Sequence, residues 1–532
     1  MKPATLLHHL VSHRSEVAPD AIALRHKQQV MTYAELHQSV KEFSDALLAC
    51  GAVRSARVGI YLSKCFEYVI AAFGSAMAGC VFVPINPALK ASQLKHILND
   101  CNVEVLITSP ERYLSIESTL NECPDLRTVV FKQGMTVSSQ TEPAYMLRQW
   151  DEFIPAPAST EAVNIIDQDI AAIFYTSGST GLPKGVVVSH RNLVSGAASV
   201  AEYLQQRADD VLIAALPFSF DAGFSQLTTA FTAGATVVLY EYTTAKEALK
   251  VIAAEGVTGM TAVPPLWIQL IEHPWSEAIA ESLRYFANTG GAMPRSVLDV
   301  LQKKAPKARP YLMYGLTEAF RSTYLDPEQV SARPNSIGKA IPNQEIMVLR
   351  PDLTPCAPGE HGELVHRGST VSLGYWNAPE LTAKRFRQIP VAGGCVSNEM
   401  AVFSGDLVYR DDEGYLYFVG RSDELIKSSG YRISPTEVEE AAYSSHLVHE
   451  AAVFGVPDER LGQKVVLVVH TSSDDFDERA LIAHMSKTLA NYMLPKTIMV
   501  ETDSLPRNSN NKIDRNLLRN TLLENNTEVV DQ

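Results

Sequence analysis

Several features that mark specialised protein classes are missing from this chain of 532 residues. It has no run of basic residues, and its formal net charge of −14 disfavours nucleic-acid binding, which needs clustered Lys and Arg to displace counterions. The apolar run Val69–Ile85 contains two glycines and a serine and falls short of the ~20 apolar residues that span a membrane. The N-terminus lacks the apolar stretch of a signal peptide. We therefore expect a cytoplasmic protein that binds no nucleic acid and is not stably inserted in a membrane.

Cysteine is also scarce, and its spacing is not that of a structural site. None of the cysteines form a pair separated by the roughly two to four residues that are typical of zinc ligands. We expect isolated thiols in a reducing compartment rather than disulfides or a metal site. The seven residues are Cys50, Cys65, Cys80, Cys101, Cys123, Cys356 and Cys395.

The pattern of apolar residues that is present predicts an α/β fold. Strand-like and helix-like segments alternate from about residue 55, which implies right-handed crossovers and mainly parallel sheets covered by helices. The predicted helices include Tyr68–Ala78, Ala91–Leu98 and Lys246–Ala254. The predicted strands are Arg57–Leu62, Val81–Ile85, Val103–Thr108, Ala171–Tyr175, Val211–Leu216, Ala235–Tyr240 and Val257–Ala262.

Two changes in this pattern divide the chain. Ser336–Gly374 has short β-rich pieces and turns, which indicate a small β-barrel-like subdomain. Near Gly420 a boundary is followed by about 110 residues with mixed segments, enough for a small domain. We predict a large N-terminal domain, residues 1–420, and a small mobile α+β domain, residues 421–532. The elements expected in the small domain are helices at Glu437–Tyr443 and Arg479–Leu489 and strands at Glu450–Val456 and Val465–His470.

A stretch rich in glycine and hydroxyl side chains, residues 174–185, follows a predicted strand and precedes Ser189, a suitable helix N-cap. Its glycines let successive backbone amides converge on an anion, while hydroxyls add donors and Lys184 adds a cation, as a triphosphate requires. It is not a Walker A sequence, because Lys184 stands between Pro183 and Gly185. The residues predicted to bind nucleotide here are Thr176, Ser177, Gly178, Ser179, Thr180 and Gly181, together with Lys184.

This stretch resembles the signature of the adenylate-forming superfamily, which contains acyl-CoA synthetases, stand-alone and modular adenylation domains, and luciferases. The resemblance covers nearly the whole chain, from Thr32 to Lys512, with the motifs in the family's order. It implies a ligase that uses ATP and Mg²⁺ to form an acyl-adenylate from a carboxylic acid, with release of pyrophosphate. It further implies transfer of the acyl group to the phosphopantetheine thiol of CoA or of a carrier protein.

Two further motifs are similar to the family's nucleotide contacts. Residues 288–292, Asn-Thr-Gly-Gly-Ala, match the segment beside adenine, and residues 314–318, Tyr-Gly-Leu-Thr-Glu, match the second nucleotide motif. The resemblance implies that Tyr314 lies against adenine, that Thr317 bonds a phosphate oxygen and that Glu318 holds Mg²⁺. The remaining nucleotide-binding residues assigned in this way are Gly290, Gly291, Ala292 and Gly315.

Motifs toward the C-terminus resemble the family's ribose, hinge and lysine motifs. The resemblance implies that Asp406 and Arg421 contact the ribose and that the small domain rotates about Asp423. Lys512 lies in the motif of the adenylation lysine, where Asn511 replaces the usual glycine and tolerates left-handed backbone angles. The assigned catalytic residues are thus Lys184, Thr317, Glu318 and Lys512, and Lys427 and Gly430 are assigned to the thiol step.

Two signals about the substrate conflict. Phe220-Asp221 after the strand end at Leu216 resembles amino-acid-activating domains, in which the Asp binds the substrate ammonium. The same Asp221 is also a suitable N-cap for a helix expected at Ala222–Thr232. The segment 431–435, in contrast, looks like that of acyl-CoA synthetases. The residues predicted to line the substrate pocket are Asp221, Phe224, Met313 and Arg321.

Three functions therefore stay open at this point. The chain is either a ligase that loads an acyl or amino-acyl group onto a carrier protein, or a small-molecule acyl-CoA ligase. The alternative from another class is a non-catalytic nucleotide-binding sensor on the same fold. Lys512 argues against the sensor, because a degenerate nucleotide binder has no need for an adenylation lysine.

Overall fold

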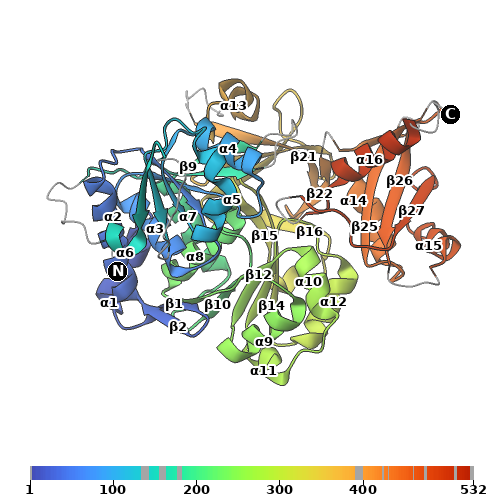
Figure 1. The fold of residues 1–532 in the computed structure, drawn as a ribbon. Helices are drawn as coiled ribbons and strands as arrows, with labels where there is room; N and C mark the ends of the chain where they lie inside the picture. The colour runs from blue at the N-terminus through green and yellow to red at the C-terminus, as the bar shows by residue number, and fades with distance from the viewer. Residues whose placement is uncertain are drawn as a thin grey trace.

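A large N-terminal part built on two sheets carries a small C-terminal unit at its side (Figure 1). The predicted α/β architecture with a small α+β domain is therefore confirmed. The computed structural model describes residues 3–132, 143–154, 163–176, 183–389, 399–421, 424–428, 431–458, 460–471, 476–508 and 512–527. The predicted site residues that lie outside these ranges are Ser177, Gly178, Ser179, Thr180, Gly181, Asp423 and Gly430.

The first sheet has eight strands in the order β19-β9-β8-β4-β3-β5-β6-β7. Strands β3 to β8 pair in parallel, as predicted, whereas β9 and β19 add an antiparallel edge. The strands are β3 (Arg57–Tyr61), β4 (Val81–Pro84), β5 (Val103–Thr108), β6 (Thr128–Phe131), β7 (Met146–Gln149), β8 (Ile170–Thr176), β9 (Lys184–Ser189) and β19 (Gly374–Tyr375). The helices beside them are α2 (Tyr33–Ala49), α3 (Phe66–Met77), α4 (Ala91–Asp100), α5 (Pro110–Leu120) and α6 (Trp150–Phe153).

The second sheet begins as a parallel sheet and continues as an antiparallel one. Strands β1, β11, β10, β12, β13 and β14 pair in parallel, with β2 antiparallel at the edge. These are β1 (Ile22–His26), β2 (Gln29–Thr32), β10 (Val211–Ala214), β11 (Thr236–Leu239), β12 (Gly259–Ala262), β13 (Tyr285–Asn288) and β14 (Arg309–Leu316). The helices are α1 (His9–Val17), α7 (His190–Tyr203), α8 (Asp221–Ala233), α9 (Ala245–Glu255), α10 (Pro264–Ile271), α11 (Glu277–Ser282) and α12 (Arg295–Lys304).

The β-rich region that the sequence predicts as a barrel-like subdomain extends this second sheet. Its strand order runs β17-β18-β21-β22-β16, and β16 also pairs with β15, so it is continuous with the parallel part. The elements are β15 (Phe320–Leu325), the short helix η1 (Pro327–Gln329), β16 (Ser336–Ala340), β17 (Gln344–Leu349), β18 (Gly362–Gly368), α13 (Pro379–Arg385), β20 (Phe386–Gln388), β21 (Met400–Arg410) and β22 (Leu416–Arg421).

One apolar core joins the two sheets. Phe224 on α8 packs against aromatic side chains of the first half, with its ring centroid 5.9 Å from that of Phe73 and 4.9 Å from that of Phe82. The ring of Phe174 on β8 lies 5.9 Å from Phe224. Burial of such large rings supplies much of the stabilisation of a core. The two sheets are therefore fixed to each other, and their strand ends form a defined edge.

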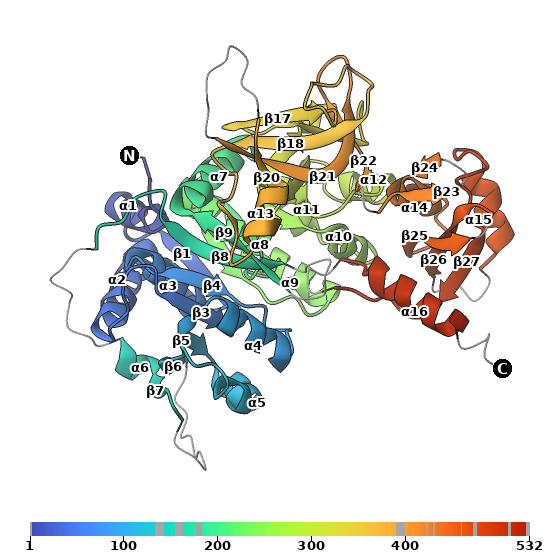
Figure 2. The same ribbon diagram turned by 90° about the horizontal axis from the view of Figure 1, so that it is seen from above.

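The small domain follows β22 and has a five-stranded sheet in which β24, β23, β26 and β25 are neighbours and β27 pairs with β26. It lies near α12 in both ribbon views (Figure 2), and the backbone N–H of Arg295 donates to Glu440 Oε1 at 3.1 Å. The elements are β23 (Ile426–Ser428), β24 (Tyr431–Ile433), α14 (Pro435–Tyr443), β25 (Glu450–Asp458), β26 (Gly462–His470), α15 (Glu478–Met485), β27 (Thr497–Glu501) and α16 (Arg515–Thr527).

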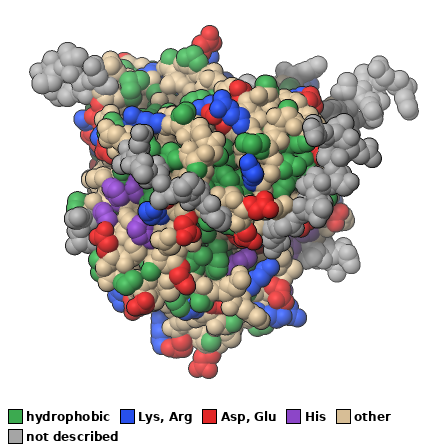
Figure 3. Space-filling model, turned by 60° about the vertical axis from the view of Figure 1, so that its left-hand side comes forward, with side chains coloured by type: hydrophobic (Ala, Val, Ile, Leu, Met, Phe, Trp, Pro, Cys, Tyr) green, Lys and Arg blue, Asp and Glu red, His purple; other side chains and the backbone are tan. Residues whose placement is uncertain are grey.

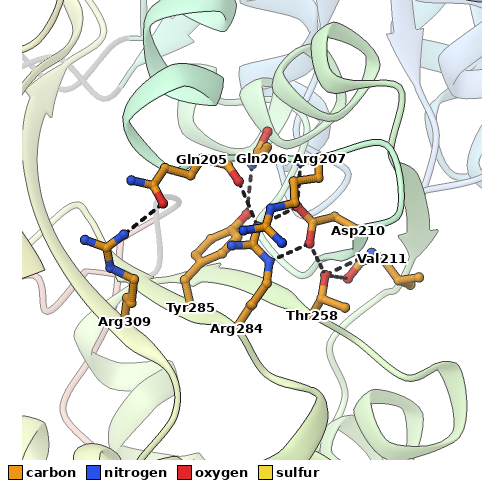
Figure 4. Close-up of polar contacts among 9 residues, drawn as sticks. All are labelled: Gln205, Gln206, Arg207, Asp210, Val211, Thr258, Arg284, Tyr285 and Arg309. Atoms are coloured by element: carbon orange, nitrogen blue, oxygen red, sulfur yellow. Dashed lines mark hydrogen bonds and ion pairs between the residues drawn. The ribbon is translucent and has the colours of Figure 1, made fainter.

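A buried carboxylate fixes the amino ends of the parallel strands in the second sheet. Asp210, whose side chain is 2% exposed, precedes β10 and accepts from Arg284 at 3.0 and 2.7 Å and from Thr258 Oγ1 at 2.7 Å (Figure 4). Thr258 precedes β12 and Arg284 precedes β13, so one residue ties three strands together. Breaking a buried pair of this kind typically costs about 3–5 kcal/mol, which marks this end of the sheet as structural.

No helix within the described ranges is long and apolar enough to cross a membrane. The six described cysteines are free thiols, and the described residues form no cluster of three or more His, Cys, Asp or Glu side chains arranged to hold a metal ion.

Histidine side chains gather around the N-terminal helix. The ring of His9 lies 4.7 Å from that of His8 and 4.9 Å from that of His13, and Figure 3 shows histidines together on this side of the molecule. His190 is buried and accepts a hydrogen bond from the Leu7 N–H at 3.0 Å. Burial, reinforced by neighbouring histidines, lowers the pKa of His8 to about 3, and burial lowers that of His190 to about 4. Both rings are therefore neutral near pH 7.

We predict that acid destabilises the folded chain through these buried histidines. Below the ordinary histidine pKa of 6.5 the unfolded chain binds protons at His8 and His190, whereas the folded chain does so only near pH 3–4. The free energy of unfolding should thus fall by roughly 5 kcal/mol between pH 6.5 and 4 from these two groups together. His190→Asn, which keeps an acceptor for Leu7, should reduce that pH dependence in urea unfolding. The exposed His446→Asn should not, and identical pH profiles for all three proteins would contradict the assignment.

Candidate active site

Several of the predicted site residues that the structure describes lie at the carboxyl ends of strands from both sheets. Thr176 ends β8 in the first sheet, while Tyr314 and Gly315 lie at the end of β14 in the second. Open α/β sheets commonly bind ligands at this edge, because the connecting loops there are free to shape a crevice. Lys512 reaches the same edge from the small domain.

The predicted phosphate loop connects two antiparallel strands. Thr176 on β8 pairs with Lys184 on β9, so these two strands run antiparallel. After β9, Ser189 caps helix α7 through a capping box with Asn192, so the predicted N-cap is confirmed. The buried Oγ1 of Thr176 has no hydrogen-bond partner within the described part of the chain. Such an orphan hydroxyl at the base of the loop is available to a ligand.

Lys184, Glu318 and Tyr375 form one cluster across the two sheets. Lys184 Nζ lies 3.4 Å from Glu318 Oε1 and 3.1 Å from the Tyr375 hydroxyl, which also donates to Glu318 Oε1 at 2.5 Å. The ammonium also lies 4.4 Å from the centre of the Tyr375 ring, a cation–π distance. Burial opposes ionisation of Glu318, but Lys184 and Tyr375 outweigh it and lower the pKa of this carboxyl. Glu318 is therefore ionised and oriented.

Tyr375 is a site residue that the sequence argument misses. Its strand β19 pairs with β9, so the ring stands beside Lys184 although 191 residues separate the two. The sequence signal at this place is the string Gly374-Tyr375-Trp376. The structure shows why it begins with glycine: the φ of Gly374 is +122°, and any Cβ there would lie 2.6 Å from Thr382. A glycine forced by its backbone next to two aromatic residues indicates a fixed ring position.

A second polar group surrounds Tyr314. Its hydroxyl donates a short hydrogen bond to Asp406 Oδ2, and Asp406 Oδ1 lies 3.6 Å from Arg421 Nε. Burial raises the pKa of Asp406, while Tyr314 and Arg421 oppose that shift. The buried His366 stacks on Tyr314 with 6.2 Å between ring centroids, and burial lowers the pKa of His366 to about 3, so the ring is neutral. Three residues assigned to the nucleoside are thus in mutual contact.

The small domain brings Lys512 to the loop after β13. Gly290 there has a φ of +77°, and a Cβ at this position would lie 3.5 Å from Lys512 Cε, so the lysine side chain packs next to this glycine. Lys512 is also exposed to solvent. The protein atoms around it, and then Arg421, nevertheless lower the pKa of Lys512, while Asp221 and Asp406 oppose that shift. Gly291 and Ala292 follow in the same loop and are exposed.

Asp221 does not cap helix α8. The helix begins at Asp221 itself, so Phe220 holds the N-cap position, and the interpretation of Asp221 as that cap is wrong. Its Oδ1 instead accepts from Thr317 Oγ1 at 2.7 Å. Burial raises the pKa of Asp221, whereas Thr317 and then Arg321 oppose the shift. The carboxylate thus faces the motif that also carries Glu318.

The other predicted pocket residues are not all brought to this cleft. Arg321 is buried beside the start of α8, where its Nη2 donates to the Ala222 carbonyl at 3.1 Å. Phe224 points into the aromatic core instead, at 1% exposure, and Met313 packs beneath the Tyr203 hydroxyl. A position on the inner face of a helix or strand looks the same in sequence whether it meets a ligand or the core. The structure therefore does not favour a pocket role for Phe224 and Met313.

Of the residues predicted for the hinge and the thiol step, only Lys427 lies within the described ranges. Lys427 is exposed on β23, and its backbone N–H donates to Gln463 Oε1 at 2.7 Å within the small domain. Asp423 and Gly430 lie outside the described ranges.

Comparison with known families agrees with this geometry. The AMP-binding enzyme model matches residues 11–376, and the model of the AMP-binding enzyme C-terminal domain matches residues 437–512. The chain belongs to the AMP-binding enzyme family. The superfamily to which the motifs point is thereby confirmed.

Relatives of this AMP-binding enzyme differ in their architecture. A feruloyl-CoA synthase from Amycolatopsis sp is 30% identical over 507 residues, which cover 94% of this chain and 96% of that protein. Tyrocidine synthase 3 from Brevibacillus parabrevis is 30% identical over 518 residues, or 96% of this chain, but the chain spans only 8% of that protein's length. The o-succinylbenzoate CoA synthetase from Bacillus subtilis, solved with its acyl-adenylate intermediate, has a TM-score of 0.80 at 28% identity, covering 96% of this chain and 98% of that one.

We predict that Asp406→Asn weakens ATP binding to this AMP-binding enzyme about 10- to 100-fold, because a hydrogen bond to a buried charged acceptor contributes about 1.5–3 kcal/mol. Isothermal titration calorimetry measures the change directly. The exposed Asp412→Asn, in the turn that follows β21, is the matched control and should bind ATP as the parent protein does. Equal affinity in all three proteins would remove Asp406 from the nucleotide site.

Proposed function

We propose that this chain activates a carboxylic acid with ATP as an acyl-adenylate and then transfers the acyl group to a thiol. One observation carries the proposal. Lys512 from the small domain reaches the cleft edge that also holds Asp221, Thr317 and the Lys184–Glu318 pair. The names of the relatives, which include a feruloyl-CoA synthase and a tyrocidine synthase, support the same reaction.

The arrangement suits the first half-reaction. A carboxylate is a poor acyl donor until it attacks the α-phosphate of ATP, which releases pyrophosphate and forms a mixed anhydride. The attacking carboxylate and the phosphates are both anions, so the barrier includes their mutual repulsion. Lys512 is placed to neutralise the carboxylate and the α-phosphate, while Lys184 neutralises the outer phosphates. Lys184 is held by Glu318 and Tyr375 before the substrates arrive, which lowers the cost of ordering it.

The residues fit a magnesium ion that arrives with ATP. Glu318 presents an ionised carboxylate, and the described residues offer no cluster of three or more acidic or sulfur ligands beside it. Mg²⁺ is usually held by one or two carboxylates together with phosphate oxygens and water, so one carboxylate suffices. When bound, the ion supplies positive charge at the phosphates. Glu318 would hold it, and Tyr375 and Lys184 keep that carboxylate ionised and oriented.

The second half-reaction requires the small domain to move. On this proposal Lys512 lies beside the carbonyl of the adenylate, which the thiol must reach in the second half-reaction. We therefore propose that the domain of residues 421–532 rotates about Asp423, withdraws Lys512 and presents the face around Lys427 and Gly430. Such alternation lets one cleft serve two half-reactions in turn.

The acceptor is the phosphopantetheine thiol of CoA or of a carrier protein, and we place the reaction in the cytoplasm, where both would be available. The relatives include a CoA synthase of similar length and a much longer tyrocidine synthase, so they support both acceptors. Transfer assays that offer CoA and phosphopantetheinylated carrier proteins in competition would distinguish the two. A non-catalytic nucleotide sensor is disfavoured, because it would not need Lys512 beside Asp221.

We expect Lys512→Ala to reduce ATP–pyrophosphate exchange by about 100- to 1,000-fold, the usual effect of losing a group that stabilises developing charge. Thioester formation from a supplied acyl-adenylate should be unchanged, because Lys512 is withdrawn in that step. The exposed Lys487→Ala in the same domain is the control and should alter neither half-reaction. Equal loss of both half-reactions in a folded Lys512→Ala protein would contradict the proposed role.

We further propose that Asp221 binds an ammonium group of the substrate. Its carboxylate is partly buried, has one hydroxyl donor in Thr317 and faces the same cleft as Lys512. An ammonium would complete its hydrogen bonding, whereas an acid without an amine would leave the carboxylate without a cation.

Amino acids should therefore support pyrophosphate exchange better than matched acids that lack the amine. Asp221→Ala should erase that preference by lowering kcat/KM for the amino acid about 100-fold at unchanged ATP affinity. The exposed Asp209→Ala is the control. Robust activity with plain acids, and no change of preference in Asp221→Ala, would refute ammonium binding.

A further inference from the structure

Arg321 is a buried cation without a carboxylate partner. Its side chain is 3% exposed, and no carboxylate oxygen of the described residues lies within 4.0 Å of its nitrogens. Buried arginines are rarely left unpaired, because removing a charge from water is costly unless an opposite charge replaces the solvent. The structure therefore maintains a positive charge at this point for which the fold itself supplies no anion.

The contacts of Arg321 fix its position without neutralising it. Nη2 donates to the Ala222 carbonyl at 3.1 Å, and Nη1 donates to the Ser225 hydroxyl. Both acceptors are uncharged and belong to the first turns of α8, directly after Asp221. The buried Nε–H has no partner within the described part of the chain. The guanidinium is thus oriented by two neutral acceptors and keeps a donor to spare.

A cavity of about 10 Å³, room for about one water molecule, adjoins Arg321 at the inner face of the second sheet. Its wall includes polar side chains of Ser225, Gln226, Thr229, Thr261 and Gln206. The Oε1 atoms of both glutamines are buried without a described hydrogen-bond partner. Gln206 is held by its other end, since Nε2 donates to the Tyr285 hydroxyl at 2.8 Å (Figure 4). The wall is mixed, with Val200, Leu204, Leu212 and Ile213 on its apolar side, and its polar side has buried groups that an alkyl chain would leave unsatisfied.

We infer that the acid activated by this chain carries a second anionic group, which pairs with Arg321. The inference rests on the proposed function, because it takes the reacting carboxylate to lie near Lys512. Asp221 begins α8, and Arg321 on β15 contacts the next turn of that helix at Ala222 and Ser225, so a bound acid would extend from the cleft past Asp221 toward the guanidinium. The substrate class is an acid with a distal anionic group, foremost an acidic amino acid, whose ammonium Asp221 would bind, rather than a fatty acid.

The charges support this class over a neutral polar tail. A carboxylate forms charge-assisted, often bidentate hydrogen bonds with a guanidinium and would neutralise the buried cation. A hydroxyl or amide tail could accept one hydrogen bond but would leave the positive charge uncompensated. Asp221 cannot serve as the counter-ion at close range, since it lies beyond the 4.0 Å of an ion pair and already accepts from Thr317.

The test is ATP–pyrophosphate exchange with the full-length protein and matched series of acids. Aliphatic dicarboxylates of increasing length are compared with the monocarboxylates in which a methyl group replaces the distal carboxylate, and acidic amino acids are compared with their side-chain amides. The doubly anionic member of each pair should have the higher kcat/KM. Arg321→Met should reverse the order by lowering kcat/KM for the anionic member about 100-fold while sparing the neutral one. Arg321→Lys should retain part of the preference.

The control is Arg127→Met, which removes a 72% exposed arginine and should leave the preference unchanged. If acids are activated but the neutral member of each pair is equally good or better in the parent protein, the inference is overturned and the proposed function stands. That comparison needs no variant, so poor folding of Arg321→Met cannot obscure it. An equal loss for both members in a folded Arg321→Met protein would also overturn it. Absence of exchange with every acid would overturn the proposed function as well.

Discussion

The contact between Lys184 and Glu318, with the Tyr375 hydroxyl bonded to both, holds together the parts of the cleft that come from different sheets. Lys184 and Tyr375 belong to the first sheet, and Glu318 follows β14 in the second. Two opposite charges at this separation stabilise each other most when water is partly excluded, as it is here. Without these contacts, the carboxylate and the ammonium would face each other across the crevice without a fixed geometry. The nucleotide site therefore depends on how the two sheets are packed.

That packing is supplied by apolar side chains remote from the chemistry. Phe224 and its aromatic neighbours join the sheets, and the Asp210 network fixes the opposite ends of the strands. The division follows a general property of α/β proteins, in which one end of the parallel strands is stabilised and the loops at the other end are free to bind ligands. Strong structural ion pairs at one end leave the charges at the other end available for substrates.

Much of this architecture could be predicted from sequence, because strand and helix periodicity is a local property. The strands β3, β5 and β8 lie within a residue or two of their predicted ranges. Motif residues such as Lys184 and Glu318 could be named because their spacing along the chain is fixed. Tyr375 could not, since its role depends on an antiparallel pairing with a strand almost 200 residues earlier.

The side-chain directions on helix α8 are a second feature that could not be predicted from sequence. Phe224 and Ser225 are neighbours in sequence, yet one ring enters the core and the other side chain meets Arg321. Helix α8 also begins one residue earlier than predicted, so Phe220 holds the cap position and Asp221 contacts Thr317. Sequence patterns specify that a position is inward-facing but not what it faces, because partners from β14 and β15 are set by the tertiary fold.

Asp221 at the start of α8 and Arg321 beside it are two ionisable groups that do not pair with each other. Asp221 is a carboxylate whose burial raises its pKa, and Arg321 is a buried guanidinium bonded only to neutral acceptors among the described residues. Joining them in a direct ion pair would be the simplest way to reduce the cost of burying both. The fold instead holds them apart, each oriented by hydroxyl or carbonyl groups. Local arrangements that lower stability in this way are expected where a ligand completes the interaction, so separated, unlike charges favour a substrate that carries both signs.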